Sequence, residues 1–372
     1  MTVDHVAGRR ADPPLGCGGR PIHGSAADRA LALEASCSFI ASTTPTADPQ
    51  EVANGDCTNK SAIFDLNGHG THVASTIAAT INGVGIAGVA PEARIVALKA
   101  CTIVGYCFVD SVAAALRYAG DLHLDVVNLS LFADPYLYCC SNDAGQRAML
   151  RTMQTATRYA QQRGVVIVVA AGNEAADLAH PVLDVLSPDY PPGDAVVREV
   201  GNNCRVAPGE LPGVLTVSST GPNTLAGYSS VGMGVIDVAA PGGDFFAATD
   251  TVQDAILAAA PNTGPSEIFN SLDPFEQFFP GITVVDHGNR YMFINGTSMA
   301  APYAAGVAAL VRQHHPGWSP SAVIAAVKAT ASSRACPVDY VPQGEISRCF
   351  GGPGKTSLFG AGLVDAQAAA AR

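Results

Sequence analysis

The segment Gly-Val-Val-Ile-Val-Val-Ala-Ala-Gly-Asn-Glu, residues 164–174, decides the fold class. Its central run is apolar on both faces, as a strand buried inside a parallel sheet must be. Further strands are expected at 93–100, 125–130, 211–218 and 235–240, and helices at 69–81, 110–121, 143–163, 298–314 and 319–331. The alternation of strands and helices indicates βαβ units with right-handed crossovers, and therefore an α/β fold with a mainly parallel sheet.

The composition excludes several classes of protein. The chain has 372 residues, of which 48% are hydrophobic and only 14% charged, and this excludes disorder and a coiled coil. A net charge of −11 without a basic run argues against nucleic acid and membrane partners. No apolar stretch approaches the roughly 18–20 residues of a membrane span. We expect an irregular segment at residues 1–35, one domain at 36–372, and a long irregular insertion within it at about 243–291.

Ten cysteines indicate disulfides and an oxidising compartment. Cys336 and Cys349 flank a short C-terminal insertion, and Cys37 and Cys57 flank another loop, so each pair could close its loop, although the sequence does not determine the connectivity. Buried free thiols are the alternative in a cytosolic protein. The chain begins Met-Thr-Val-Asp-His-Val-Ala-Gly, which is not a signal-peptide pattern. Two strands that we expect to be neighbours are followed by four cysteines that could pair in either combination: Cys101, Cys107, Cys139 and Cys140.

A candidate nucleophile lies in Asn-Gly-Thr-Ser-Met-Ala-Ala-Pro, residues 295–302. Ser298 begins a helix of small residues, where free backbone N–H groups and the helix dipole stabilise negative charge. That environment suits a serine whose attack creates an oxyanion. A plain N-cap serine is the structural alternative, and the full eight-residue string argues against it. An esterase elbow is disfavoured, because the string is Gly-x-Ser-x-Ala and not Gly-x-Ser-x-Gly.

Two further strings supply a base and an oxyanion donor. In Asn-Gly-His-Gly-Thr-His-Val-Ala, residues 67–74, His69 lies between two glycines, and imidazole titrates close enough to neutrality to act as a general base. We interpret His72 as structural, because no further ligands complete a metal site with it. Asn173 follows the end of a buried strand and a glycine, where its amide can donate to a developing oxyanion. A turn asparagine is the alternative.

Taken in this order, the three strings resemble the catalytic signatures of the subtilisin-like serine endopeptidases, peptidase family S8, of a secreted actinobacterial type. Shorter agreements at residues 85–91, 128–130, 240–242 and 360–365 extend the resemblance over 36–372. The resemblance implies a three-layer subtilisin-like fold, in which helices flank a mainly parallel central sheet. It also implies a hydrolase that acts on polypeptides as an extracellular monomer, with no nucleic acid or membrane as partner.

The same resemblance implies the role of each catalytic residue. Ser298 is the nucleophile that forms the acyl-enzyme, His69 is the general base, and Asn173 is the side-chain donor of the oxyanion hole. No cofactor is required for this chemistry. Asn82 lies in a loop that matches the family's calcium-binding loop in length, and calcium there stays an open alternative, because only this one oxygen ligand can be named.

Substrate-binding residues also follow from the resemblance. Phe132 stands where the family has glycine and is expected to narrow a subsite. The strand that pairs with extended substrate matches Ser130 and Leu131, and a wall of the primary specificity pocket matches Ala170, Ala171 and Gly172.

The third member of the family's triad, an aspartate at the end of the first core strand, has no match. Asp4, Asp12 and Asp28 all fit that pattern poorly, and Asp65 sits in the loop just before the histidine. This aspartate orients the histidine tautomer, so the sequence carries a second hypothesis: a catalytically impaired or inactive subtilisin-like protein that only binds peptide. Our explanation is that residues 1 to about 30 are not the original N-terminus, which would also account for disulfide-type cysteines without a signal peptide.

Overall fold

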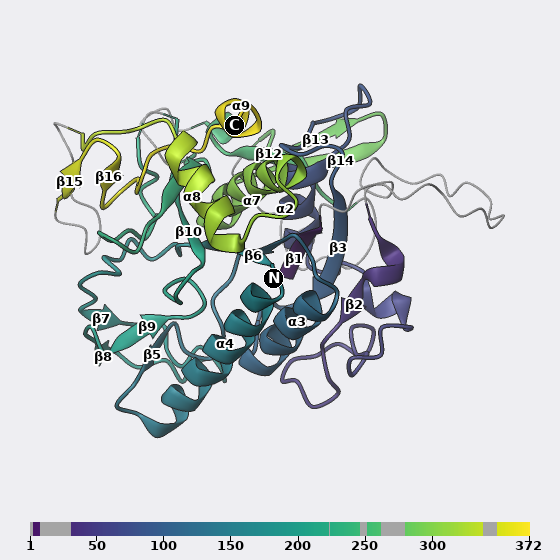
Figure 1. Ribbon diagram of the computed structural model, residues 1–372. Coiled ribbons are helices and arrows are strands. Elements are labelled where there is room, and N and C mark those ends of the chain that lie inside the picture. The colour runs from purple at the N-terminus through teal and green to yellow at the C-terminus, as the bar shows by residue number, and fades with distance from the viewer. Residues whose placement is uncertain (1–2, 8–30, 223, 246–250, 262–279, 338–347) are drawn as a thin grey trace.

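The computed structural model describes residues 3–7, 31–222, 224–245, 251–261, 280–337 and 348–372. Within these residues a seven-stranded sheet forms the middle layer and helices cover both of its faces (Figure 1). The strands lie in the order β11-β10-β6-β4-β1-β3-β2. Their bounds are β1 Val3–Ala7, β2 Cys37–Ser38, β3 Arg94–Lys99, β4 Val126–Leu129, β6 Val166–Ala170, β10 Leu215–Thr220 and β11 Val238–Pro241.

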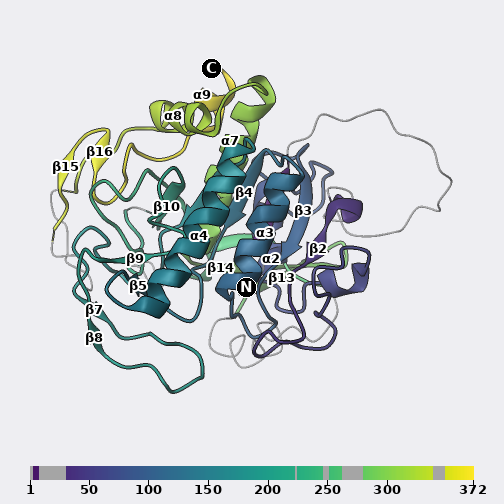
Figure 2. The same cartoon turned by 60° about the horizontal axis from the view of Figure 1, so that its bottom comes forward.

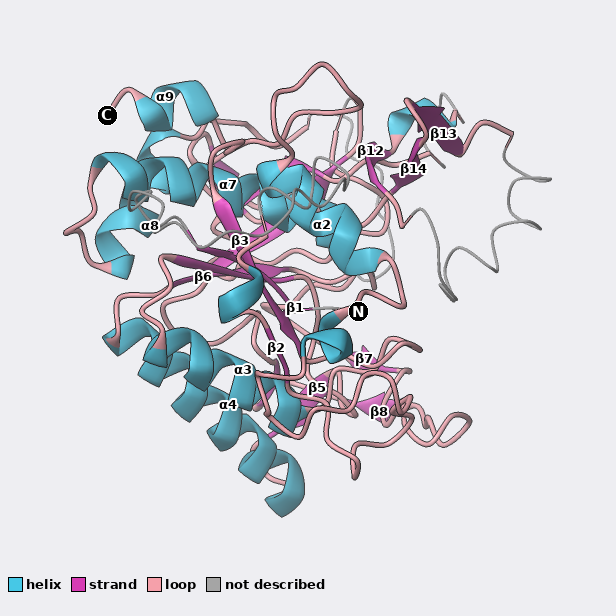
Figure 3. Cartoon of the chain, turned by 90° about the vertical axis from the view of Figure 1, so that its right-hand side faces the viewer, coloured by secondary structure: helices cyan, strands magenta, loops and turns pink. Residues whose placement is uncertain are grey.

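Two sets of helices pack on opposite faces of this sheet (Figures 2 and 3). One face carries α3 (Val109–Asp121) and α4 (Ala144–Gln162). The other carries α2 (His69–Ala78), α7 (Thr297–His314) and α8 (Pro320–Thr330), with the short α9 (Ala366–Ala370) beside them. A separate apolar cluster fills each interface. The three-layer α/β architecture with a mainly parallel sheet is therefore confirmed.

Local sequence explains why these elements begin where they do. All five residues of β6 are buried, as expected for a strand with helices on both faces. Helix α4 begins after Asp143, whose side chain accepts a hydrogen bond from the backbone N–H of Gln146 at 2.8 Å. Helix α8 has Ser319 as its N-cap and a proline at its first position. The predicted core strands and helices are all present within a few residues of their expected ends.

Strand β1, which lies between β4 and β3, runs in the opposite direction to both of these neighbours. Val3 lies opposite Leu98 of β3, and Asp4 lies opposite Asn128 of β4, in antiparallel registers. The other pairings of this sheet are parallel. The sequence predicts no regular element in residues 1–35, whereas the structure has β1 and the short 3-10 turn η1 (Leu33–Ala35) there. A five-residue run carries little signal by itself, so β1 depends on its two partner strands.

The insertion at residues 243–291 is more regular than expected. It contains η3 (Val252–Asp254), and its strands β12 (Ile256–Ala259) and β13 (Thr283–Asp286) pair antiparallel with β14 (Asn289–Ile294). His287 and Gly288 form the two-residue turn between β13 and β14, both with positive φ, as a tight hairpin requires. The expectation of an irregular segment was wrong for these residues, because strands of four to six residues give a weak periodic signal.

The disulfides agree with two of the three expectations. Cys37–Cys57 and Cys336–Cys349 close their loops as predicted. The predicted cross-pairing of the other four cysteines was wrong, because Cys101 bonds to Cys107 and Cys140 bonds to Cys204. Strand β5 (Tyr138–Cys140) pairs with β9 (Cys204–Val206) and sets Cys140 directly opposite Cys204. Neighbouring side chains alternate across a strand, so the thiol of Cys139 faces the core and is free and buried.

Small elements complete the described part of the chain. They are η2 (Lys60–Ile63), the paired strands β7 (Leu183–Asp184) and β8 (Arg198–Glu199), and the paired strands β15 (Gly351–Gly352) and β16 (Lys355–Thr356). None of the described helices is long and apolar enough to cross a bilayer.

Candidate active site

Ser298 lies at the carboxyl edge of the sheet, beside the end of β4. The hydroxyl of Ser130, one residue beyond β4, donates to the carbonyl oxygen of Ser298 at 2.8 Å, and the Ser298 hydroxyl lies 3.5 Å from the carbonyl oxygen of Ser130. The side-chain amide of Asn128 donates in turn to the Ser130 hydroxyl at 3.0 Å. Because Ser298 is the second residue of α7, its own backbone N–H has no intrahelical acceptor. Polar contacts therefore hold Ser298 from the strand side.

Asn173 is fixed by the residue just before Ser298. Its Oδ1 accepts from the backbone N–H of Thr297 at 2.8 Å and from the Thr297 hydroxyl at 2.9 Å. The Thr297 hydroxyl also accepts from the backbone N–H of Gly172 at 3.1 Å. A backbone N–H must face an oxygen, so these contacts assign the two ends of the Asn173 amide and leave its NH₂ group to face another acceptor. These hydrogen bonds join the residues that follow the carboxyl end of β6 to the start of α7.

His69 is the first residue of α2, and the loop before it is built around Asp65. One oxygen of Asp65 accepts from the backbone N–H groups of Asn67 and Gly68, and the other accepts from the N–H and hydroxyl of Thr71. Burial raises the pKa of Asp65, but the hydrogen bonds from Gly68 and Thr71 outweigh it and hold that pKa below its usual value. Asp65 is therefore an ionised cap of α2, in agreement with its location in the loop before the histidine.

The imidazole of His69 is buried, and neither ring nitrogen has a hydrogen-bond partner among the described residues. Burial lowers its pKa to about 3, so the ring is neutral at physiological pH. The backbone of Asp4 lies between those of Ala97 and Asn128, near the carboxyl ends of β3 and β4. Asp12 and Asp28 fall outside the described residues. Among the described residues, therefore, no carboxylate is seen to hydrogen-bond to the His69 ring.

His72, three residues further along α2, has a structural role as expected. Its Nε2 lies 3.1 Å from the carbonyl oxygens of Ile256 and Met292, so the proton of the neutral ring is on that nitrogen. Burial lowers its pKa to about 4. These contacts attach the β12–β14 sheet to α2. No group of three or more His, Cys, Asp or Glu side chains that could hold a metal occurs within the described ranges.

Asn82 does not offer a calcium-type ligand set. Its side chain is exposed, its Oδ1 accepts from the backbone N–H of Val84 at 3.0 Å, and its amide contacts the hydroxyl of Thr80. Calcium takes six to eight oxygens, usually including carboxylates. The residues around Asn82 fit a turn better than they fit this ion.

The expected substrate-binding residues line the ends of β4 and β6. Leu131, Ala170 and Ala171 are buried, and Gly172 is half-buried with φ of +109°. Phe132 is half-buried and packs against the cluster that includes Leu137 and Tyr138. Its ring is thus at least partly used in packing, and the narrowing of a subsite stays a prediction.

Sequence reasoning missed Glu174 and Ser230 beside this wall. The Ser230 hydroxyl donates to the Glu174 carboxylate at 3.1 Å, and a Cβ on Gly172 would meet that carboxylate at 2.3 Å. Burial raises the pKa of Glu174. The only signal was that Glu174 directly follows Asn173 in the chain, where a charged residue closes an otherwise apolar string.

Comparisons with known proteins agree with this arrangement. The model of the subtilase family matches residues 39–362. Subtilisin Savinase of Lederbergia lenta is 32% identical over 305 residues, which are 82% of this chain and 78% of that protein. M-protease of Shouchella clausii is 32% identical over 305 residues, which are 82% of this chain and 55% of that protein.

Solved structures show the same likeness. A protease of Pseudoalteromonas arctica has a TM-score of 0.54 and 31% identity, and the match covers 82% of this chain and 70% of that one. Fervidolysin of Fervidobacterium pennivorans, a keratinolytic enzyme related to subtilisin, has a TM-score of 0.55 and 28% identity, covering 84% of this chain and 37% of that one.

Proposed function

The chain belongs to the subtilase family, and from this premise we propose that it is a serine endopeptidase that cleaves polypeptides through an acyl-enzyme on Ser298. The observation that supports the proposal most directly is the pair of hydrogen bonds at the start of α7, one between Ser130 and Ser298 and one between Asn173 and Thr297. The chain spans 55% of M-protease and 78% of Subtilisin Savinase, so the activity of the whole protein is part of the proposal.

Each catalytic group has a defined task in this mechanism. The Ser298 hydroxyl attacks the scissile carbonyl while His69, neutral at physiological pH, accepts its proton and passes it to the leaving amine. The NH₂ group of Asn173 and the backbone N–H of Ser298 donate to the oxyanion that forms. Water then attacks the acyl-enzyme while His69 accepts its proton, and His69 returns that proton to the Ser298 oxygen as the acid product leaves.

The substrate and the setting follow from the same proposal. Extended polypeptide pairs with Ser130 and Leu131, and the side chain before the scissile bond lies against residues 170–172. The four disulfides of the described residues are in keeping with an extracellular protein. A monomer is part of the same proposal. A calcium ion at Asn82 is left out of the proposal, because the side-chain oxygen of Asn82 already accepts the N–H of Val84.

A second function, peptide binding with impaired or no cleavage, is favoured by one observation. The ring nitrogens of His69 lack a hydrogen-bond partner in the described part of the chain. In subtilisin, a relative, loss of the triad carboxylate alone costs about 3 × 10⁴ in kcat. A His69 that lacks such a partner would give a site that binds peptide and turns over slowly.

Covalent labelling separates the two functions. Purified wild-type protein, Ser298→Ala and His69→Ala are exposed to a fluorophosphonate probe, and peptide hydrolysis is measured in parallel. The endopeptidase predicts labelling of the wild type, slow labelling of His69→Ala and none of Ser298→Ala. Binding of an extended peptide without labelling or hydrolysis would instead establish the second function.

A further inference from the structure

A buried ion pair joins the segment between β2 and η2 to the carboxyl end of β3. The ammonium of Lys99 is 2.9 Å from the carboxylate of Glu51, and these side chains are 2% and 0% exposed. Two charges withdrawn from water in this way often contribute less stability than apolar side chains of the same volume. Stability alone therefore explains this pair poorly, and its hydrogen-bond partners are the natural place to look for a role.

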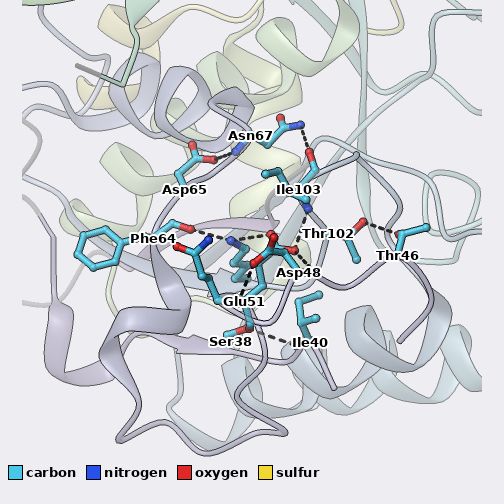
Figure 4. A network of polar contacts seen from close by, with 12 residues as sticks. Ser38, Ile40, Thr46, Asp48, Glu51, Phe64, Asp65, Asn67, Thr102 and Ile103 are labelled. Atoms are coloured by element: carbon cyan, nitrogen blue, oxygen red, sulfur yellow. Dashed lines mark hydrogen bonds and ion pairs between the residues drawn. The ribbon is translucent and has the colours of Figure 1, made fainter. Parts of the chain in front are cut away.

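Three hydrogen bonds connect Glu51 to His69, and Figure 4 shows Glu51, Ile103 and Asn67 of this chain of contacts. The second carboxylate oxygen of Glu51 accepts from the backbone N–H of Ile103 at 3.0 Å. The carbonyl oxygen of Ile103 accepts from the side-chain amide of Asn67 at 2.7 Å. The Oδ1 of Asn67 accepts from the backbone N–H of His69 at 3.2 Å. A displacement of Glu51 is thereby transmitted to the first residue of α2.

Lys99 provides a second connection to the same loop. Its ammonium donates to the carbonyl oxygen of Phe64 at 2.6 Å. Phe64 directly precedes Asp65, whose carboxylate caps α2, and the charge of Lys99 helps to lower the pKa of that carboxyl. The ion pair thus holds the histidine loop at two points, Phe64 and Asn67, which lie on either side of the cap.

We infer that Glu51 and Lys99 are positioning residues for His69, a role that rests on the proposed function of His69 as general base. Since no described residue bonds to the His69 ring, the backbone at its own position is the available means of orienting it. Glu51 supplies the acceptor that anchors the Ile103 segment. Lys99 neutralises the buried carboxylate and anchors the other side of the loop.

Two double variants separate positioning from simple packing. Glu51→Gln with Lys99→Met removes both charges but keeps a side-chain oxygen that can accept the Ile103 N–H. Glu51→Met with Lys99→Met removes that acceptor as well and leaves a side chain of similar volume. The matched control is Glu34→Met with Arg94→Met, which removes the ion pair between Arg94, at the other end of β3, and Glu34, 3.0 Å apart and 47% and 70% exposed.

The rate of fluorophosphonate labelling at Ser298 is the first measurement. We expect a loss of at least about tenfold in Glu51→Met with Lys99→Met, without a matching fall in Tm, because a base held about 1 Å out of place loses up to 10²-fold. Glu51→Gln with Lys99→Met should restore most of the rate, and the control should not change it. A labelling rate equal to that of the wild type in Glu51→Met with Lys99→Met, the Met/Met variant, would overturn the inference.

Amide hydrogen exchange is the second measurement, and it keeps the inference testable if the wild type does not label. The backbone amides of Ile103 and His69 should lose protection together in the Met/Met variant and keep it in the Gln/Met variant. If His69 keeps its protection while Ile103 loses it, the inference is wrong even where the proposed function holds. If the Met/Met variant does not fold, Asn67→Asp cuts the same chain at the Ile103 carbonyl and should give the same tenfold loss.

Discussion

At Ser298, side chains just beyond the ends of β4 and β6 contact the start of α7 directly. At His69, a series of hydrogen bonds that includes backbone groups links the first residue of α2 to Glu51. Ser130 bonds directly to Ser298, and Asn173 bonds directly to Thr297, the residue before it in α7. The Glu51–Lys99 pair reaches His69 indirectly, from Glu51 through Ile103 and Asn67 and from Lys99 through Phe64. The serine half should therefore respond to single side-chain changes nearby, and the histidine half to changes some distance away. Four predictions follow this contrast from the largest expected effect to the smallest.

The largest effect is expected from Asn173→Ala in the serine half. Its amide is fixed by Thr297, and in the proposed mechanism it donates to charge that develops only in the transition state, so kcat should fall by about 10²–10³ with little change in KM. Steady-state hydrolysis of a peptide substrate measures this. Thr297→Ser keeps the hydroxyl that binds Asn173 and serves as the control. An unchanged kcat would remove Asn173 from the oxyanion site.

Acidification should destabilise the protein through the histidine half. Burial lowers the pKa of His69 to about 3 and that of His72 to about 4, so both stay neutral in the folded protein while the unfolded chain binds protons below about pH 6.5. Their stabilising effect is complete above pH 6.5 and is lost as the pH falls, down to about pH 4 for His72 and about pH 3 for His69, at about 1.4 kcal/mol per pH unit for each ring.

Urea unfolding at about pH 7 and pH 5.5 measures this loss, which should be near 3 kcal/mol in total. The control is His69→Gln, which removes one of the two titrations and should halve the slope. An unchanged slope in that variant would mean that the His69 ring is not held neutral by burial.

A smaller effect of opposite sign is expected at Asp134, on the segment that continues from Ser130. Its carboxyl is buried, accepts the N–H of Cys107 and hydrogen-bonds to Asp189. Burial and the second carboxyl raise its pKa to about 9, so the folded state holds a proton that the unfolded chain releases above about pH 4. This group's contribution to stability is complete below pH 4 and is lost as the pH rises towards 9.

Asp134→Asn keeps both hydrogen bonds without a titrating proton. It should stabilise the protein near pH 8, by an amount that falls to nothing near pH 4. Thermal unfolding at the two pH values measures the difference. A variant that is destabilised equally at both would show that the two carboxyls do not share a proton.

The smallest effect is expected from Ser130→Ala, which removes the side-chain hydrogen bond to the Ser298 carbonyl oxygen and the hydroxyl that accepts from the Asn128 amide. The loss should be about 1 kcal/mol of stability and less than tenfold in labelling rate, because a neutral hydrogen bond has a modest net value. Tm and labelling are read on the same sample. A loss as large as that of Asn173→Ala would mean that Ser130 also acts in the transition state.

The sequence was sufficient to predict elements whose period is strong. The apolar run before Asn173 and the helix after Ser298 are long enough to show their own type, and both lie where expected. Strands β12 and β13 are too short to do so, and β1 exists only through pairing with β3 and β4. Cys140 pairs with Cys204 because of the β5–β9 register, which no spacing in the chain reveals.

The candidate site shows the same limit. Ser298, His69 and Asn173 stand in strings whose chemistry is local, and the sequence points to them directly. Glu51 and Lys99 are 48 residues apart in the chain, and only the fold brings them together. Lys99 did leave one sign, since it is a lysine at the end of a strand that is otherwise apolar in its second half and so had to find a buried partner.

The loop that carries Glu51 is closed by the Cys37–Cys57 disulfide, which spans 20 residues. A covalent closure of this kind limits how far Glu51 can move from Lys99, whereas Ser130 and Ser298 both lie outside the loop that this disulfide closes. In a reducing environment the serine half would keep its anchors and the histidine half would lose one. Formation of the Cys37–Cys57 bond therefore restrains the one loop that supplies the acidic half of the Glu51–Lys99 pair.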